Sequence, residues 1–204
     1  WTGDGWFRVP DSRAGDWEDP AIYRMPLSDD FDGEQLGLQW QFHGDMELER
    51  ASVGDGALTF TARGADPGQS QPLCVIPQHR AYAIETEVAV PAGVTAGIML
   101  FNGPTNYVGS GIGSDGMVRR YQEGCREYRW RKDPRAGASR VRLRMVNERQ
   151  DVRFYYATGD NDWEIMQPAM ELSAWRGTRA ALFAFGEGRA RFHGFRYTPL
   201  ESHA

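Results

Sequence analysis

The chain has 204 residues, of which 41% are hydrophobic, enough to form a sizeable core in a single domain. It contains no run of about 18 apolar residues, which excludes a membrane-spanning helix. The formal net charge of -5 disfavours a surface that follows nucleic-acid phosphates, so we expect neither a membrane nor a nucleic acid as partner.

Residues 1–26 show no sustained hydrophobic period and are rich in Gly, Pro and Asp, which predicts an extended, linker-like segment. Three aromatic residues, Trp1, Trp6 and Phe7, are unusual for a free linker and indicate that the segment packs on something. The first residue is Trp1 rather than Met, and no charged-then-apolar leader follows. We therefore expect residues 1–26 to be a lead-in from a missing catalytic domain, followed by a β-sandwich domain over residues 27–204.

From residue 27 onward, short apolar stretches alternate with turn residues. The segments 82–90 and 140–146 alternate apolar and polar side chains strictly, which is typical of half-buried strands. Further strands are predicted at 58–63, 95–101, 106–112, 117–122, 152–157, 163–166, 180–185 and 191–197. No long segment has a 3.6-residue period, so helices should be nearly absent. This pattern predicts an all-β fold, a two-sheet antiparallel jelly-roll sandwich.

Two local patterns invite a functional interpretation that their context does not support. Residues 111–116 match G-x-G-x-x-G, but a dinucleotide site needs this motif to open a helix. Strands are predicted on both sides, so we expect a hairpin turn. Cys74 and Cys125 are the only cysteines, and two do not make a disulfide framework. Whether they form a disulfide stays open. The compartment also stays open, and the alternatives are a cytoplasmic or a secreted bacterial protein.

Glu85 and Glu87 are the only carboxylate pair with a spacing that suggests catalysis. They lie on one face of a predicted strand, about 6.5–7 Å apart, and could serve as acid and base in glycoside cleavage. A solvated strand face of an acidic protein explains them without catalysis, and we favour that interpretation. The histidines lack zinc-ligand spacing, and no G-x-S-x-G occurs. No catalytic residue is therefore predicted.

Acidic residues crowd the loop before Leu36, with Asp29, Asp30, Asp32 and Glu34 close together. Oxygen ligands at that density could hold calcium, with Asp30 and Asp32 as the candidate ligands. The turn chemistry of Asp-Gly explains the same residues without a metal. No cofactor is required, and a structural calcium is the open alternative.

Guanidinium and aromatic groups interleave between residues 119 and 131. Faces of this kind bind sugar rings by stacking and hydrogen bonding, or single-stranded nucleic acid by the same physics. The acidic composition favours carbohydrate, with Arg119, Tyr121, Tyr128 and Trp130 as candidate ligands. A cross-strand ladder of aromatic and arginine pairs that supports the sheet is the alternative.

Residues 27–33 and 36–42 resemble the C-terminal concanavalin A-like β-sandwich domain of family 43 glycoside hydrolases, the β-xylosidase and α-arabinofuranosidase type. The similarity continues to about residue 198. Further matching segments are 72–77, 96–101, 106–109, 152–156 and 192–197.

The resemblance implies an enzyme part without its catalytic residues, because the family's five-bladed propeller carries them. It implies an accessory domain that packs on this propeller and shapes its pocket for xylan- or arabinan-type glycosides. Two alternatives stay open: an independent carbohydrate-binding module or lectin, and a stand-alone jelly-roll glycosidase. Each alternative needs its own binding or catalytic residues, and the fold alone does not establish them.

Overall fold

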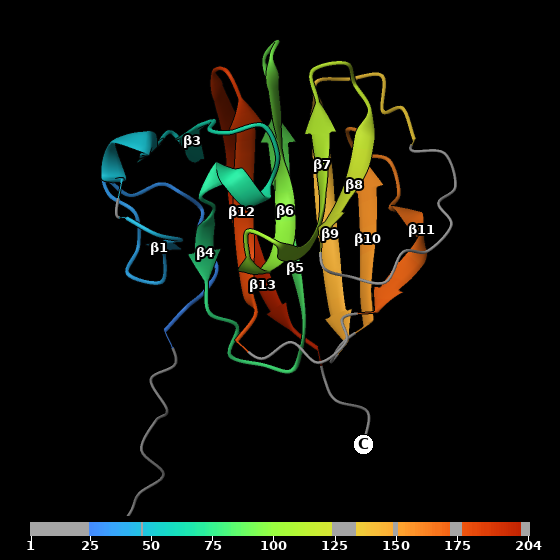
Figure 1. Ribbon diagram of the computed structural model, residues 1–204, viewed down its shortest axis with the longest axis horizontal. Helices are drawn as coiled ribbons and strands as arrows, with labels where there is room; N and C mark the ends of the chain where they lie inside the picture. Colours follow the sequence, from blue (N-terminus) through green and yellow to red (C-terminus); the bar gives the residue numbers. More distant parts are fainter. Residues whose placement is uncertain (1–24, 46, 124–133, 149–150, 172–176, 201–204) are drawn as a thin grey trace, which may run out of the picture.

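The computed structural model describes residues 25–45, 47–123, 134–148, 151–171 and 177–200. They form two antiparallel sheets that are stacked face to face (Figure 1). Among the described residues, helix is limited to two short 3-10 turns, η1 (Leu48–Arg50) and η2 (Gly68–Ser70). Neither is long or apolar enough to cross a lipid bilayer. The predicted two-sheet antiparallel sandwich is confirmed.

The six-stranded sheet has the order β1-β4-β12-β6-β7-β8. Its strands are β1 (Gln41–Phe42), β4 (Leu73–Val75), β12 (Arg179–Gly186), β6 (Val94–Gly103), β7 (Asn106–Gly113) and β8 (Val118–Glu123). The seven-stranded sheet has the order β11-β10-β9-β5-β13-β3-β2. Its strands are β11 (Glu164–Glu171), β10 (Asp151–Ala157), β9 (Arg140–Glu148), β5 (Ala81–Ala89), β13 (Arg189–Pro199), β3 (Ala57–Thr61) and β2 (Ala51–Gly54).

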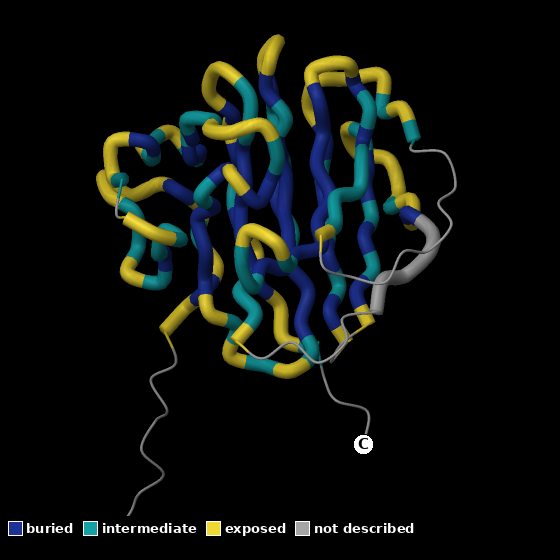
Figure 2. The backbone as a smooth tube through the Cα atoms, in the orientation of Figure 1, coloured by how far each residue is buried: buried dark blue, intermediate teal, exposed yellow. Residues whose placement is uncertain are grey.

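The core lies between the two sheets, and the alternation of the sequence decides which side chains enter it. On β5, Tyr82, Ile84 and Val88 are buried, while Glu85 and Glu87 point to the opposite face. Figure 2 shows the same division, with buried strands inside and exposed turns at both ends of the sandwich. Fully burying one large apolar side chain stabilises the fold by about 1.5–3 kcal/mol, so this stripe fixes the strand's register.

The glycine-rich segment 111–116 covers the end of β7 and the turn that leads to β8. The backbone N–H of Gly113 donates to the Met117 carbonyl at 3.1 Å, and that of Gly116 donates to the Gly113 carbonyl at 2.9 Å. Gly116 has a φ of 74°, which a residue with a side chain rarely adopts. The segment is therefore a hairpin turn, as predicted, and does not open a helix.

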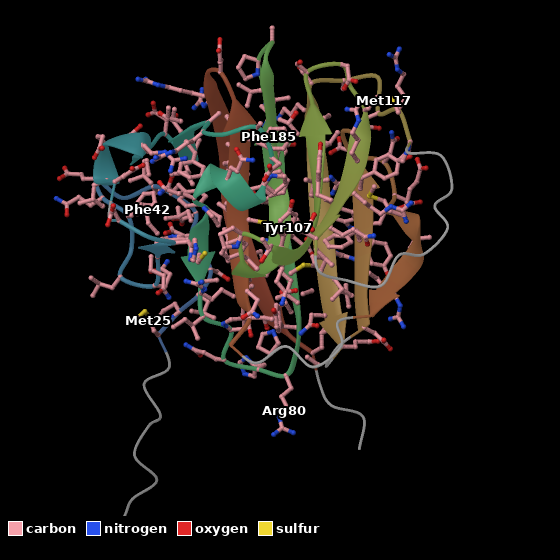
Figure 3. All side chains as sticks on the ribbon, viewed as in Figure 1. Met25, Phe42, Arg80, Tyr107, Met117 and Phe185 are labelled. Atoms are coloured by element: carbon pink, nitrogen blue, oxygen red, sulfur yellow. The ribbon has the colours of Figure 1, made fainter. Side chains whose placement is uncertain are left out.

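The outer face of the six-stranded sheet carries a second apolar cluster. It consists of Cys74, Met99, Phe101, Tyr107, Ala181 and Phe183, with Tyr121 and Phe185 packed against it. Phe183 lies opposite Gly97 on β6, and a Cβ at Gly111 would come within 2.7 Å of the Phe183 ring. Figure 3 labels Tyr107 and Phe185, which mark this face. Because this sheet is covered on both sides, β6 and β12 are apolar almost throughout.

Cys74 is buried in this cluster with a free thiol. Cys125, the cysteine whose pairing with Cys74 was left open, lies outside the described residues. The predicted lead-in over residues 1–26 also lies almost entirely outside the described part.

Candidate functional site

A groove of about 810 Å³ opens on the outer face of the seven-stranded sheet. Strands β5, β9 and β13 supply one part of its lining, and the loop between β10 and β11 supplies Trp163. The chain between residues 25 and 39 forms the opposite rim. The groove therefore gathers residues from both ends of the sequence.

A bulge in β13 shapes the groove beside β5. The pairing of these two strands shifts between His193 and Arg196, where Gly194 has a φ of 65°. The hydroxyl of Thr86 donates to the Gly194 carbonyl at 2.6 Å and closes the gap that the bulge leaves. Phe195 pairs instead with Asp29, through backbone hydrogen bonds of 2.6 and 2.8 Å. This bridge holds the rim segment against the sheet.

The carboxylates of Glu85 and Glu87 both lie in the groove, and each holds an arginine of β9. The Glu85 Oε1 accepts from the Nε of Arg144 at 2.8 Å and lies 2.7 Å from its Nη2. The Glu87 Oε1 accepts from the Nε of Arg140 at 2.6 Å. Both carboxylates project from one strand and do not face each other across the groove. This geometry favours a charged, ion-paired strand face over an acid–base pair.

Trp163 is held in the groove wall by two arginines that stand two residues apart on β9. The Cζ atom of Arg142 lies 5.0 Å from the centre of the indole ring, and that of Arg144 lies 4.4 Å away. Arg142 also donates to the carbonyl of Asn161 at 2.6 Å, which anchors the loop that carries the tryptophan. The ring is thus fixed from β9 and from its own loop.

The sequence analysis did not select Trp163 as a binding residue. The signal was present, because Trp163 follows a polar hairpin turn directly and the neighbouring segment 140–146 presents arginines on alternate positions. The antiparallel pairing of β9 with β10 brings the two features together. Sequence alone does not specify that pairing.

His193 lines the groove beside Glu87, its register partner on β5. Removal from water lowers the pKa of His193, and the positive charge of Arg140 lowers it further. The imidazole is therefore neutral at pH 7. The charged groups of the groove are then Asp29, Asp30, Glu85, Glu87, Arg142 and Arg196.

Arg119 and Tyr121, the described members of the predicted carbohydrate face, lie on β8 of the other sheet. Arg119, on β8, forms an ion pair with Asp115 at 2.5 Å, and its hydrogen bonds lower the pKa of that carboxyl. Tyr121 presents its ring edge-on to Phe183 and Phe185, with centroid distances of 5.6 and 5.7 Å. Tyr128 and Trp130 lie outside the described residues. Carbohydrate binding at these four residues stays a prediction.

The acidic loop uses its carboxylates to hold backbone and side chains. Asp29 accepts from the Phe31 backbone at 2.8 Å, from the Gln39 amide at 3.1 Å and from the Trp40 indole at 2.8 Å. Asp30 accepts from the backbone N–H of Asp32 at 3.3 Å. Across the described ranges, no group of three or more His, Cys, Asp or Glu residues is arranged to hold a metal ion. Calcium at Asp30 and Asp32 stays a prediction.

A comparison of the sequence with models of known protein families shows which family it matches. The family model of the β-xylosidase C-terminal concanavalin A-like domain matches residues 28–198. The chain belongs to this family. The resemblance found at residues 27–33 and 36–42 is therefore confirmed, and the domain is part of a group found in family 43 glycoside hydrolases.

Solved structures share the fold of this chain. The GH43 BlXynB protein from Bacillus licheniformis is 22% identical, with a TM-score of 0.74 over 98% of this chain and 45% of its own. The xylan β-1,4-xylosidase from Bacillus halodurans C-125 is 19% identical, with a TM-score of 0.74 over 97% of this chain and 45% of its own. This chain therefore spans less than half of their length. Among curated proteins, no sequence matches it.

Proposed function

We propose that this domain is the non-catalytic accessory sandwich of a glycoside hydrolase that acts on xylan- or arabinan-type glycosides. It packs on the catalytic propeller of the same protein and shapes the substrate pocket there. The family match over residues 28–198 carries the proposal. The solved xylosidases that share the fold are more than twice as long, which leaves room for a separate catalytic domain.

The state of the groove carboxylates supports a non-catalytic role. Glu85 and Glu87 each hold an arginine, and they project from the same strand. A glycosidase places one carboxyl on each side of the scissile bond, with a proton available on one of them. The pair in this groove does not have that arrangement.

The rim of the groove supports a docking surface. Leu38 is 92% exposed and stands between Gly37 and Gln39, which both line the groove. Met25, on the same rim, is 46% exposed. Single exposed apolar residues are common, but two on one rim, beside a charged groove, suit an interface with another domain. We infer that the catalytic domain contacts this rim.

The experiment compares the 204-residue chain with the longer product of its gene on aryl β-xyloside and aryl α-arabinofuranoside. We expect the longer product to cleave at least one substrate and the 204-residue chain to cleave neither. Turnover by the 204-residue chain would overturn the accessory role. Glu85→Gln and Glu87→Gln would then test whether the groove is the source of that activity.

A further inference from the structure

We propose that the groove on the seven-stranded sheet binds a neutral saccharide, with Trp163 as its stacking platform. This gives the domain a ligand of its own, beyond support of a catalytic domain. The chemistry of the ligand follows from the groove. Only the choice of xylose- and arabinose-based probes rests on the proposed function.

Contacts from β9 and from its own loop hold Trp163 in one position. Arg142 and Arg144 pack on its ring from β9, and the Asn161 carbonyl ties the loop to Arg142. The ring also lines the groove and is only half-buried. A large, rigid aromatic surface at a groove wall binds an apolar sugar face with little loss of conformational entropy.

The groove also supplies hydrogen-bonding groups for a sugar that stacks on Trp163. Within the described ranges, the contacts of Glu85 and Glu87 run through Oε1, which leaves Oε2 of each to accept from a hydroxyl. Arg196 lies opposite Glu85 on β13 and forms no ion pair with any described residue. The groove therefore offers both donors and acceptors. A sugar hydroxyl, which both donates and accepts, matches that pattern.

The charges of the groove favour neutral over anionic sugars. Four carboxylates line the groove, those of Asp29, Asp30, Glu85 and Glu87. Arg142 and Arg196 are the lining guanidinium groups, and His193 is neutral at pH 7. Arg144 and Arg140 neutralise Glu85 and Glu87, so the charges in and beside the groove balance, and no excess of positive charge selects an anionic sugar such as a uronic acid. The groove volume of about 810 Å³ is within the range of small-ligand sites.

The test titrates the 204-residue chain with xylohexaose and with arabinohexaose, by calorimetry and by tryptophan fluorescence. We expect Trp163→Ala to weaken binding by about tenfold or more, and Trp163→Phe to restore part of the affinity because it keeps a ring. Tyr121→Ala tests the competing candidate face on the opposite sheet. Phe185→Ala is the matched control, since it removes a partly buried aromatic that belongs to neither candidate site. Thermal unfolding of each variant checks that it is folded.

Three results would overturn the proposal. They are no binding of either saccharide, binding that Trp163→Ala leaves unchanged, and binding that Tyr121→Ala abolishes while Trp163→Ala does not. The same titration on the longer gene product, with a non-hydrolysable thio-linked xylo-oligosaccharide, must also show binding that depends on Trp163. If only the 204-residue chain binds, the groove is covered in the whole protein and the site is refuted. Aryl glycoside turnover is measured separately, so failure of the groove and failure of the accessory role are distinguishable.

Discussion

At the scale of single residues, Cys74 shows how the second apolar cluster controls chemical reactivity. Burial raises the pKa of its thiol to about 12, and the thiolate is the reactive form. We predict that a Cys125→Ser variant leaves Cys74 unreactive toward Ellman's reagent at pH 8 in native buffer and fully reactive in denaturant. The released thionitrobenzoate is measured by absorbance. Rapid labelling of the native variant would contradict the burial of Cys74.

His43 makes stability depend on pH. Arg179 donates to its Nδ1 at 3.1 Å, and the ring packs edge-on to Phe101. Burial lowers the pKa of His43, and the charge of Arg179 lowers it further. Its contribution to stability is therefore fully present above the unfolded value of about 6.5 and is lost as pH falls toward the folded value.

We predict that the free energy of unfolding, measured with urea, decreases from pH 7.5 to pH 5. Exchange of the imidazole for an amide in His43→Gln should make this decrease smaller, because an amide accepts from Arg179 without titrating. His193→Gln should remove a separate share, since the pKa of His193 is also lowered. An unchanged pH dependence in His43→Gln would refute the role given to His43.

At the scale of secondary-structure elements, Arg50 joins η1 to its neighbours. Its Nη2 donates to the carbonyls of Thr61 at 3.0 Å and Ser70 at 2.8 Å, and its Nη1 donates to that of Gln71 at 3.3 Å. Its guanidinium also stacks on Phe60, 4.9 Å from the ring centre. One buried side chain thus satisfies carbonyls at the end of β3 and around η2.

We predict that Arg50→Met lowers the free energy of unfolding by about 2–4 kcal/mol, because it leaves these carbonyls without donors. Arg50→Lys should recover little, since an ammonium group does not reproduce the planar fork. Arg189→Met, at an exposed arginine of β13, is the control and should change stability by less than about 0.5 kcal/mol. Equal effects of the two methionine variants in urea unfolding would contradict the prediction.

The sequence predicted each described strand of five or more residues, whether one or both of its faces are buried. Strands β5 and β9 alternate over nine residues each, so a period of two is visible. Strands β1 and β4 have two and three residues, too few to show a period. The buried outer face of β6 and β12 depends on Phe183 packing over glycines of other strands. Such contacts follow from sheet order, which local patterns do not specify.

One part of the candidate site was predicted from the sequence, and another part was not. The alternation placed Glu85 and Glu87 on the outer face, and it placed the arginines of β9 opposite to Val141, Leu143 and Met145. The ion pairs between them then require the β5–β9 pairing, which joins residues about 60 positions apart. The bulge at Gly194 and the bridge from Asp29 to Phe195 depend on contacts between the two ends of the chain. The groove was therefore not predicted.

At the scale of the whole molecule, a substitution on the exposed rim tests whether a second domain contacts the protein beside the groove. In the longer gene product, we predict that Leu38→Glu lowers the thermal midpoint and the turnover of aryl glycosides, because a charge would enter an apolar contact. In the 204-residue chain, the same change should leave the thermal midpoint within about 1–2 °C, since Leu38 is 92% exposed there.

Leu48→Glu is the matched control for this prediction. Leu48 is 58% exposed on η1 and does not line the groove. It should leave the turnover of the longer product unchanged. If Leu38→Glu behaves identically in both lengths of protein, the rim does not contact a catalytic domain. If only the longer product is affected, the accessory domain stabilises the enzyme through this rim, and the groove lies at the boundary between the two domains.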